Sequence, residues 1–196
     1  MKLYSSQRSP FARKARVIAH ELGLKLEEIK AAPREDPTYR RVNPLGKVPA
    51  LVLDDGSVLI DSPVICEYLN QVGGGKFFPG MSIWRPVSGR WKALGLQALG
   101  DGLAEAAIGV MRERMRDHKD EATEARELAA INAVLDVLER TKFADVPTIG
   151  EVAVACAIGY ADYRLTDLDW RAARPKLTEW YEKFSQYPSM LATQPQ

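Results

Sequence analysis

Short apolar runs and longer helical segments alternate over the first 72 residues of the chain. Strands are expected over residues 2–4, over residues 24–29, where apolar and polar residues alternate, and over the apolar runs at 50–53 and 58–60. Helices are expected over residues 10–22 and 63–72. Residues 31–42 contain two prolines and predict a loop with a short, irregular helix. The expected order is therefore β-α-β-α-β-β-α, and the right-handed crossover rule makes the first two strands parallel neighbours.

Turn and cap residues mark the ends of these elements. Asp55-Gly56, between the last two strands, predicts a type I′ hairpin turn, because glycine tolerates the positive φ that this turn requires. Ser62 is expected to cap the second helix, and Pro63 suits its first position, where no backbone N–H is needed. Gly23 is expected to end the first helix.

The stretch from Gly73 to Gly80 is the clearest break in composition, because three consecutive glycines and a proline cannot continue a helix. We expect a linker at 77–83 between an α/β domain at 1–76 and an all-helical domain at 84–196. The expected helices of the second domain cover residues 84–117, 121–142, 152–161 and 174–184. The charged run from Arg112 to Arg126 is interpreted as a solvated face and turn.

Charge and cysteine usage narrow the classes of function. Lys and Arg number 27 and Asp and Glu number 26, so the net charge of +1 favours neither nucleic acid nor an anionic membrane as a partner. The chain starts without the apolar core of a signal peptide, and no apolar run reaches the length of a membrane span. Cys66 and Cys156 lie far apart in apolar contexts, which favours two buried thiols in a reducing cytoplasm. No spacing resembles a zinc site, so no metal is expected.

The segment from Asn43 to Leu51 reads Asn-Pro-Leu-Gly-Lys-Val-Pro-Ala-Leu, and Asp61-Ser62 follows at a helix start. This combination resembles the glutathione-binding half of a glutathione transferase N-terminal domain, of the bacterial serine- or cysteine-type. The resemblance implies a thioredoxin-like N-terminal domain followed by an all-helical C-terminal domain. It is strong over residues 1–72 and weaker in the helical half.

The resemblance also implies how glutathione is held. The Val48-Pro49 bond is cis in this family, and the backbone of Val48 pairs with the cysteinyl part of glutathione as an added strand would. Asp61 and Ser62 receive the γ-glutamyl end at the helix start, where free N–H groups attract a carboxylate. Lys47 either meets the glycyl carboxylate or is a solvated loop lysine, and the sequence leaves both open.

Ser9-Pro10-Phe11 at the first helix start matches the serine and cysteine branches of the family. The resemblance assigns Ser9 the catalytic role of donating a hydrogen bond to the glutathione thiolate, assisted by the positive end of the helix. A nucleophilic serine would need an adjacent base. His20 lies about 16 Å along the same helix at 1.5 Å per residue, so a Ser-His pair is not expected.

Three other residues remain alternatives for activating the thiol. Tyr4 is one, because other branches of the family use a tyrosine near the end of the first strand, although a strand aromatic is the simpler interpretation. Ser5 and Ser6 are the others. Position 9 holds no cysteine, which argues against disulfide-exchange chemistry because serine cannot form a mixed disulfide.

Two features of the helical half also match the family. Asp101 stands between two glycines in a long helix, which indicates either close helix packing or, in dimeric relatives, an acid that reaches the γ-glutamyl ammonium bound by the partner. Thr148 and Glu151 form a capping box before the apolar helix, with glutamate where the family usually has aspartate.

The implied function is that of an enzyme which activates glutathione as a co-substrate and transfers it to a small hydrophobic electrophile. The resemblance further implies a homodimer in the cytoplasm. The alternative is a non-catalytic relative that uses the scaffold as an interaction module, as the stringent starvation proteins do. The intact sulfur-site residues favour the enzyme.

Overall fold

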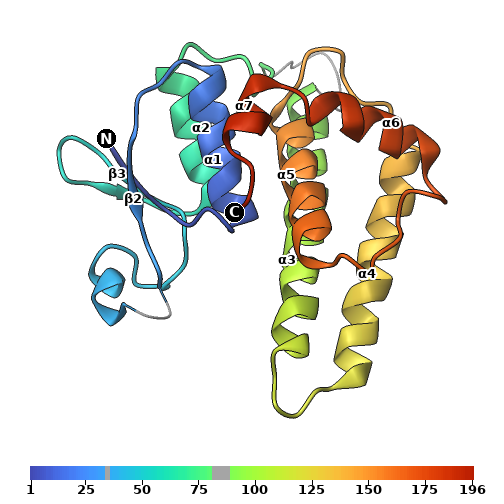
Figure 1. Ribbon diagram of the computed structural model, residues 1–196. Coiled ribbons are helices and arrows are strands. Elements are labelled where there is room, and N and C mark those ends of the chain that lie inside the picture. The colour runs from blue at the N-terminus through green and yellow to red at the C-terminus, as the bar shows by residue number, and fades with distance from the viewer. Residues whose placement is uncertain (34–35, 81–88) are drawn as a thin grey trace.

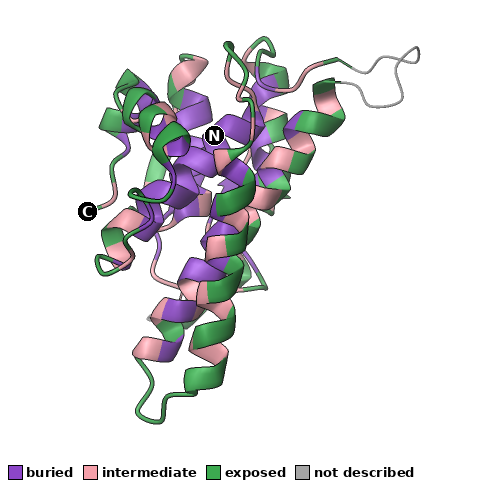
Figure 2. Ribbon diagram, turned by 90° about the vertical axis from the view of Figure 1, so that its right-hand side faces the viewer, coloured by how far each residue is buried: buried purple, intermediate pink, exposed green. Residues whose placement is uncertain are grey.

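The computed structural model describes residues 1–33, 36–80 and 89–196. They form a mixed four-stranded sheet flanked by helices, followed by a helical domain (Figure 1). The linker expected at 77–83 and the helix start expected at Trp84 lie partly or wholly on 81–88, outside the described residues, so the division there stays a prediction. Figure 2 shows buried residues concentrated in the upper part of the view, whereas the lower ends of α3 (Gly89–Arg114) and α4 (Glu121–Glu139) are mostly exposed or intermediate.

The sheet has the order β2-β1-β3-β4. Its strands are β1 (Lys2–Ser5), β2 (Glu27–Lys30), β3 (Ala50–Val52) and β4 (Val58–Leu59). β1 runs parallel to β2, as expected, and antiparallel to β3. Leu3 of β1 lies opposite Leu51 of β3, and both are fully buried at the centre of the sheet.

The second strand lies three residues later than expected. Leu24 and Leu26 pack against the hydrophobic core without joining the ladder, and the strand begins at Glu27. This edge strand is mostly polar and exposed, because pairing with β1 determines its register rather than its own apolar pattern.

The hairpin turn is not type I′. That turn needs positive φ at both central residues, whereas among the described residues only glycines have positive φ. The connection is a three-residue loop in which the Gly56 N–H donates to the Leu53 carbonyl at 3.1 Å, with Gly56 at φ 85°. The Asp55 carboxylate accepts hydrogen bonds from the backbone N–H and hydroxyl of Ser57, which stabilises the longer loop.

Helices α1 (Pro10–Glu21) and α2 (Ser62–Val72) lie side by side, and a short 3₁₀ helix, η1 (Pro37–Arg41), occupies the predicted irregular segment. The Ser9 hydroxyl caps α1, and Gly23 follows its end with φ 64°. The prediction that Ser62 caps α2 is wrong by one residue. Asp61 is the cap, because its carboxylate reaches the N–H of Ser62, which is already the first helical residue.

The helical domain contains α3 (Gly89–Arg114), α4 (Glu121–Glu139), α5 (Ile149–Arg164), α6 (Pro175–Phe184) and α7 (Pro188–Ala192). α5 is buried nearly all round, as its apolar sequence predicts, and packs closely along α3. A Cβ on Gly100 would lie 2.7 Å from the backbone of α5, whereas a Cβ on Gly102 would meet nothing within 4 Å. Gly100 is therefore the glycine that permits close packing.

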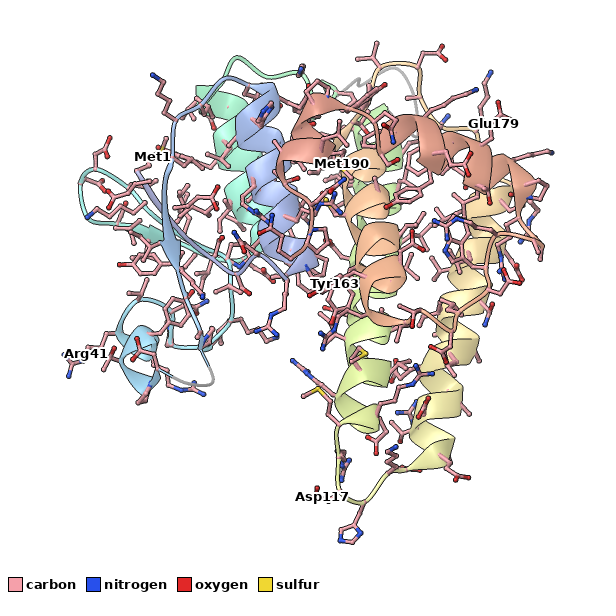
Figure 3. All side chains as sticks on the ribbon, in the orientation of Figure 1. Met1, Arg41, Asp117, Tyr163, Glu179 and Met190 are labelled. Atoms are coloured by element: carbon pink, nitrogen blue, oxygen red, sulfur yellow. The ribbon has the colours of Figure 1, made fainter. Side chains whose placement is uncertain are left out.

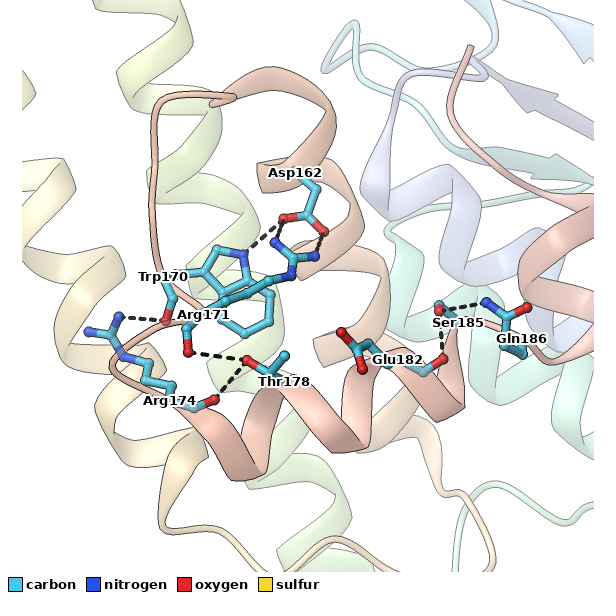
Figure 4. Close-up of polar contacts among 8 residues, drawn as sticks. All are labelled: Asp162, Trp170, Arg171, Arg174, Thr178, Glu182, Ser185 and Gln186. Carbon is cyan, nitrogen blue, oxygen red and sulfur yellow. Dashed lines mark hydrogen bonds and ion pairs between the residues drawn. The ribbon is translucent and has the colours of Figure 1, made fainter.

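Local polar contacts stabilise the ends of these helices. Thr148 and Glu151 form a capping box, and the Glu151 carboxylate also accepts from the N–H of Ala144 at 3.0 Å. After α5, the indole of the buried Trp170 donates to Asp162 at 2.8 Å, and the guanidinium of Arg171 binds both oxygens of the same carboxylate (Figure 4). These bonds tie the α5–α6 connection to α5.

Two expectations for the helical half need correction. The charged run is not wholly solvated. Glu113 is buried and accepts from the N–H of Asp120 at 2.6 Å, which organises the connection between α3 and α4. The last expected helix covers residues 174–184, but Pro188 opens a further helix, α7, because proline suits a first helical position.

Candidate functional site

Ser9 lies at the start of α1, partly exposed, and lines a shallow crevice that is too narrow to hold a water molecule. Its Oγ accepts a hydrogen bond from the N–H of Ala12 at 3.2 Å, which is the capping interaction. A hydroxyl that accepts in this way still has its own proton to donate. The free N–H groups of the first helical turn add a positive potential at the same place. Ser9 can therefore stabilise an anion without losing its role as a cap.

The three alternatives for activating the thiol, Tyr4, Ser5 and Ser6, do not lie at a helix cap as Ser9 does. The ring of Tyr4 lies 5.8 Å from that of Tyr39, in a small apolar cluster on the other side of β1 from the main core. The hydroxyl of Ser5 is buried and lies 3.4 Å from the carboxylate of Glu28. Ser6 is partly exposed, and its carbonyl accepts from the N–H of Ser9. Of these serines, only Ser9 caps α1.

The loop before β3 presents backbone groups next to a cis Val48–Pro49 bond. The carbonyl of Lys47 is held by the phenol of Tyr39 at 2.9 Å and by the amide of Asn43 at 2.7 Å. Burial raises the pKa of Tyr39 to about 12, so this donor stays protonated at ordinary pH. Val48 makes no backbone hydrogen bond to any described residue, so its N–H and carbonyl are available to an extended peptide.

The start of α2 combines a charge with an unsatisfied polar atom. Asp61 is exposed, and its carboxylate accepts from the N–H of Ser62. Ser62 is 1 % exposed, and its Oγ has no hydrogen-bond partner among the described residues. A buried hydroxyl without a partner is uncommon in folded proteins, and a bound polar group would satisfy it. Lys47 is exposed and also makes no ion pair with a described residue.

Asp101 is not a free acid in this chain. Its two carboxylate oxygens lie 2.6 and 2.8 Å from the ammonium of Lys14, whose side chain is 1 % exposed. Burial raises the pKa of the Asp101 carboxyl, Lys14 opposes that shift, and the charge of Asp61 adds to it. The pair joins α1 to α3 near the start of α2.

Sequence reasoning missed Lys14 and two arginines on the same helix. Arg13 and Arg16 are buried and donate to groups near the end of the chain: Arg13 to Met190 O at 3.0 Å and Arg16 to Thr193 O at 3.5 Å. Figure 1 shows α7 over α1 and the C-terminus beside the first turn of that helix. Three basic residues in a twelve-residue helix are typical of a solvated face, and only the packing of α7 and α5 over α1 shows that these residues are buried.

Two family models match the chain. The model of the glutathione S-transferase N-terminal domain matches residues 8–72, and the model of the C-terminal domain matches residues 121–183. The chain belongs to the glutathione S-transferase family. The GST-like protein YibF of Escherichia coli K12 is 34 % identical over 100 % of this chain and 98 % of its own length.

Solved structures of family members agree in fold. A glutathione transferase family member from Pseudomonas fluorescens Pf-5, with bound glutathione, is 39 % identical with a TM-score of 0.86, over 100 % of this chain and 98 % of the other. The same relative has also been solved with S-(propanoic acid)-glutathione, covering 100 % of both chains at a TM-score of 0.85. A glutathione S-transferase from Methylobacillus flagellatus, with glutathione bound, is 31 % identical with a TM-score of 0.85. The match covers 100 % of this chain and 99 % of the other.

No described helix combines the length and the apolar character needed to cross a membrane. The described residues also contain no group of three or more His, Cys, Asp or Glu side chains able to hold a metal ion.

Proposed function

We propose that this glutathione S-transferase family protein binds glutathione, stabilises its thiolate and transfers it to a small hydrophobic electrophile. The observation that carries the proposal is the Ser9 hydroxyl, which caps α1 through its oxygen and keeps its proton for an anion at the start of the helix. Glutathione is the co-substrate, and the chemistry needs no metal. Both cysteines are free and buried, which agrees with a reducing, cytoplasmic setting.

Glutathione lies across the N-terminal domain in this proposal. The backbone of Val48 pairs with the cysteinyl residue, and Lys47 faces the glycyl carboxylate. At the start of α2, Ser62 receives the γ-glutamyl carboxylate and Asp61 pairs with the ammonium. The unsatisfied Ser62 hydroxyl and the unpaired backbone of Val48 support this placement.

The thiolate, rather than a protein side chain, is the nucleophile. The hydrogen bond from Ser9 and the positive end of α1 lower the pKa of the glutathione thiol from its usual value of about 8.5. The protein's own thiols are unsuited to this role, because burial raises the pKa of Cys66 to about 12 and also raises that of Cys156.

Ser9→Ala tests this mechanism. A hydrogen bond to an anion is worth roughly 1.5–3 kcal/mol, so the pKa of the bound thiol should rise by about one to two units. Turnover near pH 7 should fall about tenfold to hundredfold and recover at high pH, where solvent removes the proton. The measurement is the ultraviolet thiolate absorbance of bound glutathione across pH, with turnover of a standard electrophile.

Ser6→Ala is the matched control, because it removes a neighbouring hydroxyl that does not cap α1. Its titration curve should match that of the unmodified protein. If Ser9→Ala leaves the curve unchanged, Ser9 is only a cap, and another group activates the sulfur.

We also propose a twofold homodimer formed by α2 and α3. Trp91 on α3 is 54 % exposed and Val64 on α2 is 49 % exposed, and Arg90 contacts Glu67 between the two helices. Exposed large apolar side chains on two helices that an ion pair connects are typical of an interface. In this dimer Asp101 lies near the glutathione of the partner.

Light scattering at micromolar concentration should give twice the chain mass of 21.8 kDa. Trp91→Lys should give monomers, whereas Val146→Lys, at a position that is 69 % exposed in the connection between α4 and α5, should not. A mass near that of one chain for the unmodified protein would contradict the dimer.

A further inference from the structure

We propose that Tyr39 and Asn43 are positioning residues for glutathione, because together they hold the peptide group that carries the N–H of Val48. The inference rests on the proposed function, in which the backbone of Val48 pairs with the cysteinyl residue of the ligand. It concerns the peptide bond between Lys47 and Val48, one residue before the cis bond to Pro49. In this role Tyr39 and Asn43 act through the loop and do not touch glutathione.

The carbonyl oxygen of Lys47 accepts two hydrogen bonds from side chains. The phenol of Tyr39 donates one at 2.9 Å, and the amide of Asn43 donates the other at 2.7 Å. A carbonyl oxygen has two lone pairs, so both of its acceptor positions are used. Tyr39 belongs to η1 and Asn43 to the loop that follows it, so this carbonyl is tied to both segments.

Fixing the carbonyl of Lys47 also fixes the N–H of Val48. The atoms of a peptide group lie close to one plane, and in a trans bond the C=O and the N–H point in opposite directions. The Lys47–Val48 bond is not one of the cis bonds among the described residues, so it is trans. The N–H of Val48 is therefore directed away from the two donors, and it makes no backbone hydrogen bond to a described residue.

The two donors are themselves held in place. Tyr39 is 4 % exposed and Asn43 is 1 % exposed. The ring of Tyr39 lies 5.8 Å from that of Tyr4 on β1, and the Oδ1 of Asn43 accepts from the N–H of Leu45 at 3.0 Å. The backbone N–H of Asn43 also donates to the carbonyl of Tyr39 at 3.0 Å, which fixes the two residues relative to each other. Neither side chain can swing away from the Lys47 carbonyl without breaking these contacts.

A ligand that accepts from the Val48 N–H therefore meets a donor that is already oriented. A loop without this support would lose conformational freedom when glutathione binds, which lowers affinity. Hydrogen bonds to the carbonyl also polarise the peptide group and strengthen its N–H as a donor. Figure 3 shows η1, which ends at Arg41, well apart from the helices of the C-terminal domain. Both effects should thus act on the affinity for glutathione and leave the reaction at the sulfur unchanged.

Tyr39→Phe tests the inference, because it removes one donor to the Lys47 carbonyl and keeps the buried ring. Calorimetric titration should show about threefold to tenfold weaker binding of glutathione, the effect expected for one lost hydrogen bond. The KM for glutathione should rise by a similar factor, whereas kcat and the pKa of the bound thiol should stay unchanged. Asn43→Ala removes the other donor and should weaken binding in the same way. Tyr187→Phe is the matched control, since it removes a phenol hydroxyl from a 39 % exposed residue directly before α7.

The outcomes separate this inference from the proposed function. Unchanged affinity for glutathione in Tyr39→Phe and in Asn43→Ala would overturn the inference and leave the proposed function standing. A raised pKa of the bound thiol, or a fall in kcat as large as the loss of affinity, would also overturn it, because these residues would then act on the sulfur. If the unmodified protein binds no glutathione, the proposed function is wrong and this inference is wrong with it.

Discussion

Replacing Asp101 with asparagine should lower the free energy of unfolding by about 3–5 kcal/mol, because it leaves the ammonium of Lys14 buried without a counter-charge. Lys14 is 1 % exposed, and its Nζ binds both Asp101 oxygens. The measurement is urea unfolding followed by circular dichroism.

Lys14→Met should cost less than Asp101→Asn, because the Asp101 side chain is 22 % exposed and water can solvate part of its charge. Replacing both residues together, with Lys14→Met and Asp101→Leu, should recover much of the loss, since a buried ion pair is often no more stable than apolar residues of similar volume.

The chain offers a matched control for this pair. Lys183 and Glu179 lie at the same 2.6 Å separation, but their side chains are 75 % and 69 % exposed. Glu179→Gln should therefore change the stability by less than about 1 kcal/mol. If Asp101→Asn is no more damaging than Glu179→Gln, the buried pair does not stabilise the contact between α1 and α3.

Removing the charge of Asp61 should weaken glutathione binding strongly while leaving α2 intact. Asn is as good a helix cap as Asp, so Asp61→Asn isolates the ion pair with the γ-glutamyl ammonium. Losing one partner of a charged hydrogen-bonded pair that the ligand covers costs on the order of 2–5 kcal/mol, a loss of about 30-fold or more in affinity. Calorimetry measures the loss, and unchanged affinity would contradict the assignment.

Ser62→Ala provides the companion test, because stability and binding should respond differently. The hydroxyl has no partner in the free chain, so its removal should leave the unfolding free energy unchanged or raise it. The same change should weaken glutathione binding about tenfold or more, since a hydrogen bond to a carboxylate is lost. Loss of stability in parallel with affinity would mean that Ser62 has only a structural role.

The sequence by itself determined the features that depend on neighbours within a few residues. Ser9 and Thr148 cap their helices, and the cap type can be read locally because a capping bond joins residues two or three positions apart. The positive φ of Gly23 follows from the residue type at a helix end, and the burial of α5 follows from its nearly continuous apolar sequence. The motif from Asn43 to Ser62 was sufficient to indicate the family, since a loop and a helix start are both local.

Only the tertiary structure decided the electrostatics of the site. Lys14 and Asp101 are 87 positions apart, and Arg13 and Thr193 are 180 apart, so nothing in either local pattern shows that they meet. The position of β2 in the sequence likewise depends on its pairing with the parallel strand β1. The alternating pattern that begins at Leu24 does not determine it. Basic side chains on a helix face water unless other helices cover them, and it is the packing of α3, α5 and α7 around α1 that turned three ordinary surface residues into buried charges.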